Sequence, residues 1–280
     1  MKSIKSIRDK IKTTEIVKKI VSTAELMSSK KLKRYFASLD KSRKYLKTCE
    51  DFFSIITKNN DTYPIYQNKK ILLVIMGSDK SLCGSYNIKL SNTIMDEINK
   101  NKNDFKIICI GKQLTKKIDK KNILCDFSFN NKKDSHSEYC SFLVNTLENT
   151  MLKEKCNICK LIYTKYHSNH KQTVICKNII PVGQNYENNN NNNIEIETIE
   201  DECLVLEKIE STLLHATFFH AYINCFFSEH SSRVASMGVA NKNCDKILKK
   251  TNTEYNKKRQ LIITNELIEI ISGSIIINKF

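Results

Sequence analysis

The loop at residues 77–84, GSDKSLCG, is the first stretch whose residue types could do chemistry. Glycine-rich loops between a strand and a helix hold phosphate groups with their backbone N–H groups. This loop departs from the Walker pattern, because its second glycine comes too late and no Lys follows it, and it also lacks the GxGxxG spacing. We interpret it as a strand-to-helix turn. Cys83 has no nearby His to activate it, so we predict neither a nucleophile nor a bound cofactor here.

Four residues with metal-binding side chains lie close together in the chain: Cys156, Cys159, His167 and His170. A zinc finger separates its Cys pair from its His pair by about twelve residues, and its two histidines by about three to five. In this chain seven residues separate the pairs and two separate the histidines. We therefore predict no metal site.

The remaining candidates are histidines and carboxylates in the C-terminal part of the chain. His215, His220 and His230 have no evident shared partner, so we interpret them as packing or surface residues. Glu266 and Glu269 are three apart, which places them on one face of a helix, but paired carboxylates need a pocket for acid–base catalysis. The sequence therefore predicts no catalytic residue.

Two long helices are predicted at the ends of the chain. Residues 1–57 contain neither Gly nor Pro, and their apolar residues recur three and four apart. The same period runs through residues 228–273 and extends back to about residue 200. Its apolar seam, which includes Ile263, Leu267 and Ile270, is narrow, as in helices that wind around each other. We expect an antiparallel coiled coil whose longer C-terminal helix extends beyond its partner.

The middle of the chain has a different period. Both prolines and four of the six glycines lie between residues 61 and 183. Short apolar runs that end in glycine alternate there with helical segments, which indicates an α/β domain with a mainly parallel, Rossmann-like sheet. Strands are predicted at 71–76, 106–111, 123–129, 159–166 and 174–182, and helices at 87–99, 112–120 and 136–153.

The predicted fold class is therefore α/β with long helical arms. The domains are an N-terminal coiled-coil helix (1–60), the α/β domain (61–183), an Asn-rich loop (184–199) and a C-terminal coiled-coil helix (200–280). Residues 188–193 are six consecutive Asn, a composition typical of a disordered loop. We assign this tract no function and expect its deletion to be tolerated.

The chain carries a formal net charge of +16. Residues 1–57 hold 15 Lys and Arg against 6 Asp and Glu, a net of +9, and Lys30, Lys31, Lys33 and Arg34 form the densest cluster. Such an excess indicates an acidic or polyanionic partner. An AT-rich coding bias, which enriches Lys, Asn and Ile together, is the other source of the charge. The cluster is accordingly either a contact surface or a solvated helix face.

Targeting and membrane signals are weak in this sequence. The N-terminal residues carry charges throughout, unlike a secretory signal, and the eleven cysteines are scattered, as in reduced intracellular proteins. The longest apolar runs are too short to span a membrane. We expect a protein that does not cross the membrane.

Three segments together resemble one family. They are residues 7–34, the internal SDKSLCGSYN at 78–87, and the C-terminal stretch 228–273 with SSRVASMGVANKN and YNKKRQLIIT. In order, separation and arm–domain–arm architecture they resemble the gamma subunit of F-type ATP synthase, the central rotor shaft, over the whole chain. Lys80, Ser81 and Ser85 replace an Arg and two Gly of the usual family loop, and the Asn tract looks like an insertion.

The resemblance implies partners and a mechanism. The coiled coil would fill the bore of a hexamer of alpha and beta subunits. The α/β domain and the foot of the coil would meet the epsilon subunit and the membrane c-ring. Proton flow would turn the ring and shaft, and the asymmetric shaft would drive the catalytic sites through their states. Nucleotide and magnesium would belong to the partner subunits, so no cofactor is expected in this chain.

The resemblance also implies contact residues. Arg259 and Gln260 match an Arg-Gln pair that meets a catalytic subunit, where a guanidinium fork suits a carboxylate and the pair would act as a catch. The cluster Lys30, Lys31, Lys33 and Arg34 would face acidic segments of the catalytic subunits. Glu266 and Glu269 complete the predicted contact set.

Two other functions are alternatives to that of a rotor subunit. A basic coiled-coil nucleic-acid-binding protein fits the charged arm, although aromatic residues do not interleave with its cluster and no nucleic-acid motif is present. An enzyme built on the α/β domain lacks catalytic residues. Since no transit peptide is evident, we expect the cytoplasmic face of the bacterial inner membrane rather than the mitochondrial matrix face.

Overall fold

The computed structural model describes residues 3–57, 70–100, 104–121, 123, 125, 127–129, 136–168, 171–181 and 202–277. The chain divides into two compact units, one formed by Met1–Met27 with Val234–Phe280 and the other by Ser28–Arg233. His170 and the Asn tract, for which we stated expectations from the sequence, lie outside the described residues. The four-part domain division stays a prediction, because most of its boundaries also lie there.

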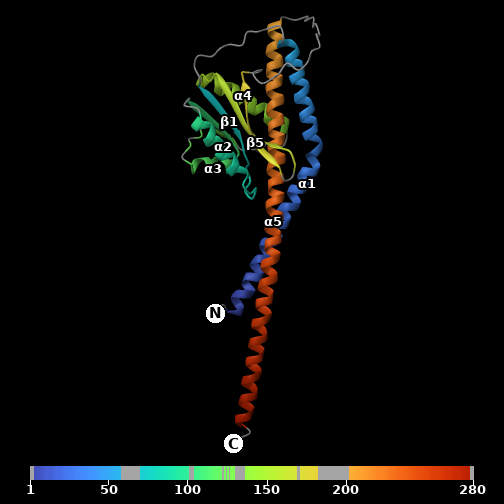
Figure 1. Cartoon of the computed structure of the whole chain (residues 1–280), viewed down its shortest axis with the longest axis vertical. Helices are drawn as coiled ribbons and strands as arrows, with labels where there is room; N and C mark the ends of the chain where they lie inside the picture. Colours follow the sequence, from blue (N-terminus) through green and yellow to red (C-terminus); the bar gives the residue numbers. More distant parts are fainter. Residues whose placement is uncertain are drawn as a thin grey trace. The chain divides into compact units, whose positions relative to one another are not determined.

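Two long helices, α1 (Ile4–Thr57) and α5 (Glu202–Ile277), confirm the predicted helical arms (Figure 1). Helix α1 begins after Ser3, whose Oγ accepts a hydrogen bond from the Ser6 N–H at 3.2 Å, an ordinary N-cap. Both helices far exceed the roughly 10–14 residues common in globular proteins. Helices of this length are stabilised mainly by packing along a partner, and each unit provides such packing.

The unit Ser28–Arg233 contains a five-stranded sheet with the order β3-β2-β1-β4-β5. The first four strands along the chain are parallel, and β5 pairs antiparallel with β4. The predicted, mainly parallel α/β domain is thus confirmed. The strands are β1 (Ile71–Met76), β2 (Phe105–Ile110), β3 (Phe127–Phe129), β4 (Ile158–Tyr166) and β5 (Gln172–Ile180).

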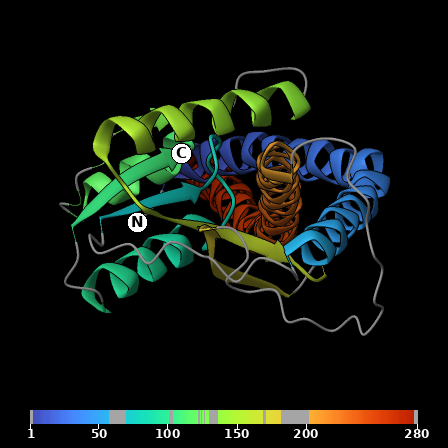
Figure 2. The same ribbon diagram turned by 90° about the horizontal axis from the view of Figure 1, so that it is seen from above.

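Helices cover both faces of this sheet, as Figure 2 shows. On one face Leu73 and Ile75 of β1 pack under α2 (Tyr86–Lys100) and α3 (Lys112–Asp119). On the other face Leu72, Val74 and Met76 pack under α4 (His136–Glu154) and α5. Because β1 is buried on both faces, all six of its residues are apolar.

In the same unit α1 and α5 run antiparallel. Phe53 and Cys49 of α1 pack with Leu213 and Ala216 of α5. Tyr35 lies earlier in α1 than Cys49, and it contacts Phe226, which lies later in α5 than Ala216. The two ring centroids are 5.3 Å apart. As residue numbers fall on one helix they rise on the other. This confirms the predicted antiparallel pairing.

In the unit formed by Met1–Met27 and Val234–Phe280 the two helices also pair antiparallel. Lys18 Nζ lies 2.6 Å from Asp245 Oδ1, and Gly238 faces the Glu25 carboxylate. In the described part of α5 that belongs to this unit, the buried residues are Met237, Cys244 and Thr251, each seven apart. This heptad spacing is the coiled-coil period.

Strand β3 is shorter than predicted. The strand expected at 123–129 begins only at Phe127. The backbone N–H groups of Lys121 and Ile123 both donate to Ile118 O, at 2.8 and 3.5 Å, so these residues still close the end of α3. Strand β5 also begins two residues earlier than predicted, because it forms a tight hairpin with β4.

Candidate functional site

The loop at 77–84 lies at the carboxyl end of β1, where two strand-ending glycines touch. A Cβ atom on Gly77 would come within 2.5 Å of Leu114 Cβ. Gly111, at the end of β2, has a φ of 113°, and a Cβ there would lie 2.8 Å from the Gly77 carbonyl carbon. The repeated strand-then-glycine pattern therefore reflects a close backbone crossing.

The polar groups of this loop pair with one another. Asn87 Oδ1 accepts from the Ser78 N–H at 3.2 Å, and Asn87 Nδ2 donates to Ser78 Oγ at 2.7 Å. Asp79 Oδ1 accepts from the Lys112 N–H at 3.0 Å, so the start of α3 is met by the chain's own carboxylate. The arrangement holds the starts of two helices beside the end of β1, as a structural turn does.

The Cys and His residues considered for zinc do not converge in the described part of the chain. Cys156 and Cys159 are buried, and burial raises the pKa of both thiols, which disfavours the thiolate that a metal needs. His167 Nε2 instead lies 2.8 Å from Thr173 Oγ1. Within the described ranges no group of three or more His, Cys, Asp or Glu is placed to hold a metal ion.

His220 joins three elements in the buried core. Ser42 Oγ of α1 donates to Leu39 O at 2.8 Å, so its one proton is used and it accepts from His220 Nδ1 at 3.2 Å. His220 Nε2 then accepts from Asn224 Nδ2 at 3.0 Å, and Asn224 Oδ1 accepts from the Tyr166 N–H of β4 at 3.1 Å. Desolvation, with Arg43 nearby, lowers the pKa of His220 to about 4. His220 is therefore a neutral packing residue.

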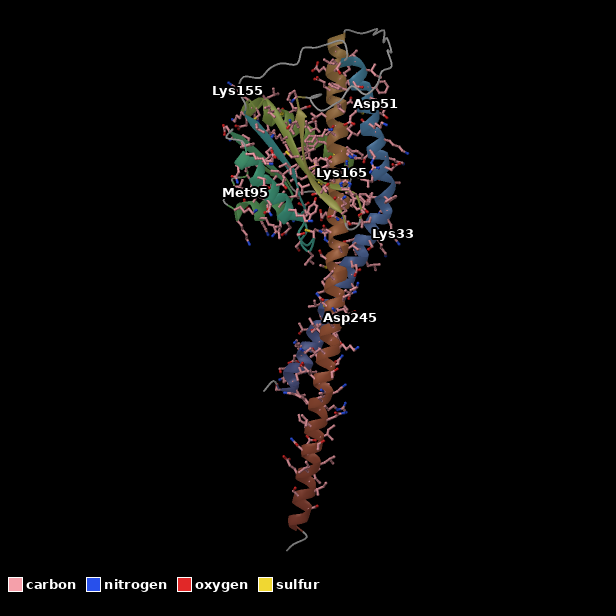
Figure 3. The ribbon with its side chains drawn as sticks, in the orientation of Figure 1. Lys33, Asp51, Met95, Lys155, Lys165 and Asp245 are labelled. Atoms are coloured by element: carbon pink, nitrogen blue, oxygen red, sulfur yellow. The ribbon has the colours of Figure 1, made fainter. Side chains whose placement is uncertain are left out.

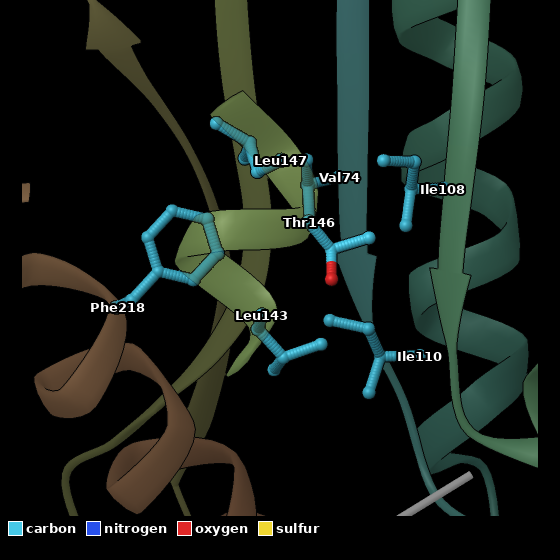
Figure 4. A pocket seen from close by; sticks show the side chains of 7 residues that line it. All are labelled: Val74, Ile108, Ile110, Leu143, Thr146, Leu147 and Phe218. Carbon is cyan, nitrogen blue, oxygen red and sulfur yellow. The ribbon is translucent and has the colours of Figure 1, made fainter. Parts of the chain in front are cut away.

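One small cavity lies between the sheet, α4 and α5 (Figure 4). Its volume is about 10 Å³ and its lining is almost wholly apolar. A water molecule needs about 10–15 Å³ together with polar partners. The cavity therefore suits neither a nucleotide nor an organic cofactor. It is lined by Val74, Ile108, Ile110, Leu143, Thr146, Leu147 and Phe218.

The predicted basic cluster on α1 has two kinds of member. Lys30, Lys33 and Arg34 are exposed, and Lys33 is labelled in Figure 3. Lys31 is half-buried, with its Nζ 6.0 Å from the centroid of the Phe226 ring. Desolvation, followed by the charge of Lys80, lowers the pKa of Lys31. The head groups of Lys30, Lys33 and Arg34 are therefore exposed to another chain, and Arg34 Cζ also lies 5.6 Å from the centroid of the Tyr35 ring.

The predicted contact residues of α5 are all exposed: Arg259, Gln260, Glu266 and Glu269. Thr264 Oγ1 donates to the Gln260 backbone oxygen at 2.9 Å. Among the described residues no ion pair includes Arg259, Glu266 or Glu269. The structure leaves these side chains available but assigns them no contact.

Sequence reasoning missed how many apolar side chains are exposed at this end of α5. Every residue from 259 to 272 is exposed. Ile263, Leu267 and Ile270, which we predicted as part of a helix–helix seam, are 43%, 54% and 67% exposed. The signal was present in LIITNELIEIIS, where apolar residues occupy several faces of the helix instead of one stripe. A contiguous apolar surface of this kind marks an interaction site.

Comparisons with known proteins agree over the full chain. The family model described as ATP synthase matches residues 3–275. The ATP synthase gamma chain of Fusobacterium nucleatum is 28% identical over 284 residues, which cover 98% of this chain and 99% of that one. The ATP synthase gamma chain of Ehrlichia canis is 26% identical and covers 98% of both chains.

Solved structures share the fold. A chain from the rotor of Euglena gracilis mitochondrial ATP synthase has a TM-score of 0.64 at 14% identity and covers 93% of this chain and 98% of that one. A chain from the central stalk and c-ring of Tetrahymena thermophila mitochondrial ATP synthase has a TM-score of 0.61 at 16% identity, with 79% and 99% covered.

Paired terminal helices, an inserted α/β sheet and an exposed apolar helix end define a class of subunit that acts through contacts with other chains. The chain belongs to the ATP synthase family, in which it is a gamma chain, a non-catalytic rotor subunit of the central stalk.

Proposed function

We propose that this chain couples rotation of a proton-driven c-ring to conformational cycling of the catalytic sites in an alpha/beta hexamer. The observation that carries the proposal is the exposed apolar end of α5, residues 259–272. Apolar side chains on several faces of one helix need an apolar surrounding on several sides. A bore meets that need, and because apolar contact is non-directional, it also permits the helix to turn within it.

The transmitted energy sets a requirement on the helices. Each proton that crosses the membrane supplies about 2.3 kcal/mol per 100 mV. Several protons together therefore deliver an energy comparable with the roughly 5–15 kcal/mol that stabilises a whole domain. A free helix pair would unwind under that load. Support from a surrounding hexamer keeps the helices folded while they turn.

The proposed partners are the alpha and beta subunits around the coil, and the epsilon subunit and c-ring at the α/β domain. The similar Euglena gracilis chain comes from a structure of OSCP, F1 and the c-ring, and the similar Tetrahymena thermophila chain comes from a structure of the central stalk and c-ring. Both structures support the proposed partners. No described helix is long and apolar enough to cross a membrane. As the resemblance to ATP synthase gamma subunits implies, we propose contact with the membrane only through the c-ring.

The proposed location is peripheral, on the cytoplasmic face of a bacterial inner membrane. Curated relatives from Fusobacterium nucleatum, Ehrlichia canis and Clostridium perfringens, all bacterial gamma chains, support it. The mitochondrial matrix face is the alternative, and fractionation of cells that express a tagged chain separates the two.

Co-purification of the full-length chain tests the function directly. We expect a tagged chain to bring down ATPase subunits with ATP hydrolysis activity. A variant with Leu261→Lys and Ile268→Lys places charges on the apolar end and should recover fewer of these subunits, whereas Lys242→Ala and Lys246→Ala on the same helix should not. Recovery of nucleic acid in place of ATPase subunits would reject the rotor and favour the nucleic-acid-binding alternative.

A further inference from the structure

Arg233 of α5 is buried, at 6% exposed, and uses all three of its nitrogens. Its Nε donates to Ser81 O and its Nη2 to Lys80 O, both at 3.3 Å. Nη2 also donates to Glu229 Oε1 at 2.6 Å, and Nη1 lies 3.1 Å from His230 Nδ1. One side chain thus connects α5 to two successive carbonyl groups of the loop that follows β1.

The residues beside Arg233 on α5 hold its guanidinium in place. Glu229 and His230 are four and three residues earlier, so both lie on the same helix face as Arg233. Desolvation, with Arg233 next to it, lowers the pKa of His230 to about 3, so the ring is neutral and its Nδ1 accepts the hydrogen bond. Because the Glu229 carboxylate and the His230 imidazole are fixed on the same helix, they orient the guanidinium of Arg233 toward the loop.

The loop needs such an anchor because its backbone is strained. Leu82 has a φ of 65°, in the left-handed region that non-glycine residues rarely adopt. Its side chain is 53% exposed, so side-chain packing does not hold this conformation. The residues just before it, Lys80 and Ser81, are the two whose carbonyl groups Arg233 binds. The hydrogen bonds from Arg233 therefore support this strained turn from the α5 side.

Cys83 is the last residue of this loop, and its thiol can be used to report whether the loop is closed. The residue is 4% exposed, and its Sγ lies 3.5 Å from both Ser78 Oγ and Asn87 Nδ2. Cys83 packs with Leu73 and Tyr86, and because it belongs to the loop, we expect its thiol to become more accessible to solvent if the loop leaves α5. Cys159, which is fully buried within β4, provides an internal reference that loop opening does not expose.

We propose that Arg233 is a positioning residue that latches the loop at 78–83 to α5, so that the α/β sheet and α5 turn as one body under load. The coupling part of this inference rests on the proposed rotor function, whereas the latch itself does not. Lys would replace Arg233 only in part, because an ammonium group lacks the planar fork that reaches two carbonyl groups and a carboxylate together.

The test compares Arg233→Ala with the matched control Arg43→Ala, an exposed arginine on α1. The purified full-length chain is treated with a thiol-reactive label, and mass spectrometry of its peptides measures the labelling rates of Cys83 and Cys159. We expect the Cys83 rate, relative to Cys159, to rise at least about tenfold in Arg233→Ala, which corresponds to about 1.4 kcal/mol. It should stay at the wild-type value in Arg43→Ala. An unchanged Cys83 rate in Arg233→Ala overturns the latch.

The assembled complex then tests coupling through the ratio of proton pumping to ATP hydrolysis. We expect Arg233→Ala to lower this ratio while hydrolysis continues. Faster Cys83 labelling with an unchanged ratio overturns the coupling role. Failure of the wild-type chain to assemble with ATPase subunits would instead reject the proposed function, and it is seen before any variant is compared.

Two milder variants keep the test informative if Arg233→Ala does not fold. Arg233→Lys keeps the charge and the stem, and Glu229→Gln keeps the shape of the group that orients the fork. We expect both to label Cys83 at rates between wild type and an open loop. We further expect Glu229→Gln to respond less than Arg233→Lys, because it leaves the two loop carbonyl groups bound. Wild-type rates in both variants overturn the latch.

Discussion

Individual glycines of this chain have opposite structural requirements. Gly111 has a φ of 113°, and a Cβ there would lie 2.8 Å from the backbone of Gly77. Gly273 of α5 meets nothing within 4 Å. We expect Gly111→Ala to lower the free energy of unfolding by about 2–4 kcal/mol, since it combines backbone strain with a clash. Urea denaturation of the full-length chain measures it.

Gly273→Ala is the matched comparison and should act in the opposite direction. A Cβ at Gly273 would meet open space, and in a helix interior alanine is favoured over glycine by about 0.8–1 kcal/mol. We expect slower amide hydrogen exchange around residue 273 and no loss of global stability. Equal destabilisation by both substitutions would contradict the close crossing described at Gly111.

The buried imidazole of His220 predicts a pH dependence. Its pKa is about 4 in the folded chain and about 6.5 when unfolded. Between these values the unfolded state binds more protons, so stability is full above about pH 6.5 and falls as the pH drops toward 4. We expect His220→Gln to reduce the loss of unfolding free energy between pH 7 and pH 5, by on the order of 1–3 kcal/mol.

Ser42→Ala is the control for this titration. It removes the hydroxyl that His220 Nδ1 meets at 3.2 Å but leaves the imidazole in place. We expect lower stability at every pH with the wild-type dependence retained. If His220→Gln and Ser42→Ala show the same pH dependence, another group is responsible.

At the scale of elements, the exposed end of α5 carries the proposed catch. Arg259 and Gln260 are exposed, so the double substitution Arg259→Ala with Gln260→Ala should fold and assemble normally. A charged, bidentate contact with a catalytic subunit would be lost, and we expect ATP synthesis and hydrolysis to fall about tenfold. Lys249→Ala, also exposed on α5, should change both rates little. Control rates in an assembled double mutant would reject the catch.

Helix α1 carries the exposed part of the basic cluster. We propose that Lys30, Lys33 and Arg34 face acidic segments of partner subunits. Lys30→Glu with Lys33→Glu should weaken ATP-driven proton pumping, and the difference from wild type should shrink at high salt, because exposed charges are screened beyond about 8–10 Å. Lys41→Glu with Lys47→Glu makes the same charge change on the same helix. An equal effect of both pairs would show that only net charge matters.

Across the whole molecule, local patterns predicted the elements and their pairing. The narrow seams of α1 and α5 predicted an antiparallel coiled coil, and the run ILLVIM predicted the buried central strand β1. Both succeeded because hydrophobic period and burial are short-range properties of a chain. The predicted start of β3 was wrong. The hydrophobic period does not show whether the residues between α3 and β3 close the helix or begin the strand.

The site residues were less predictable because their partners are remote in sequence. The Ser42–His220 contact joins residues 178 apart, and Arg233 reaches Ser81 across 152 residues. Spacing within one segment carries no information on such pairs. His220 and His230 were interpreted as packing or surface residues, and the structure buries both. The contacts of Arg233 emerged only from the folded backbone of the loop.

The exposed apolar end of α5 also has a consequence for the life of the protein in a cell. A newly made copy without its partners displays Leu261, Ile268 and Ile271, at 63%, 55% and 57% exposed. Chaperones and proteases recognise unfolded chains by the same kind of surface. Chaperones and proteases would thus bind a copy that lacks its partner subunits, although that copy is correctly folded. Its abundance should follow the supply of the subunits that cover this end, which makes assembly itself the control on its turnover.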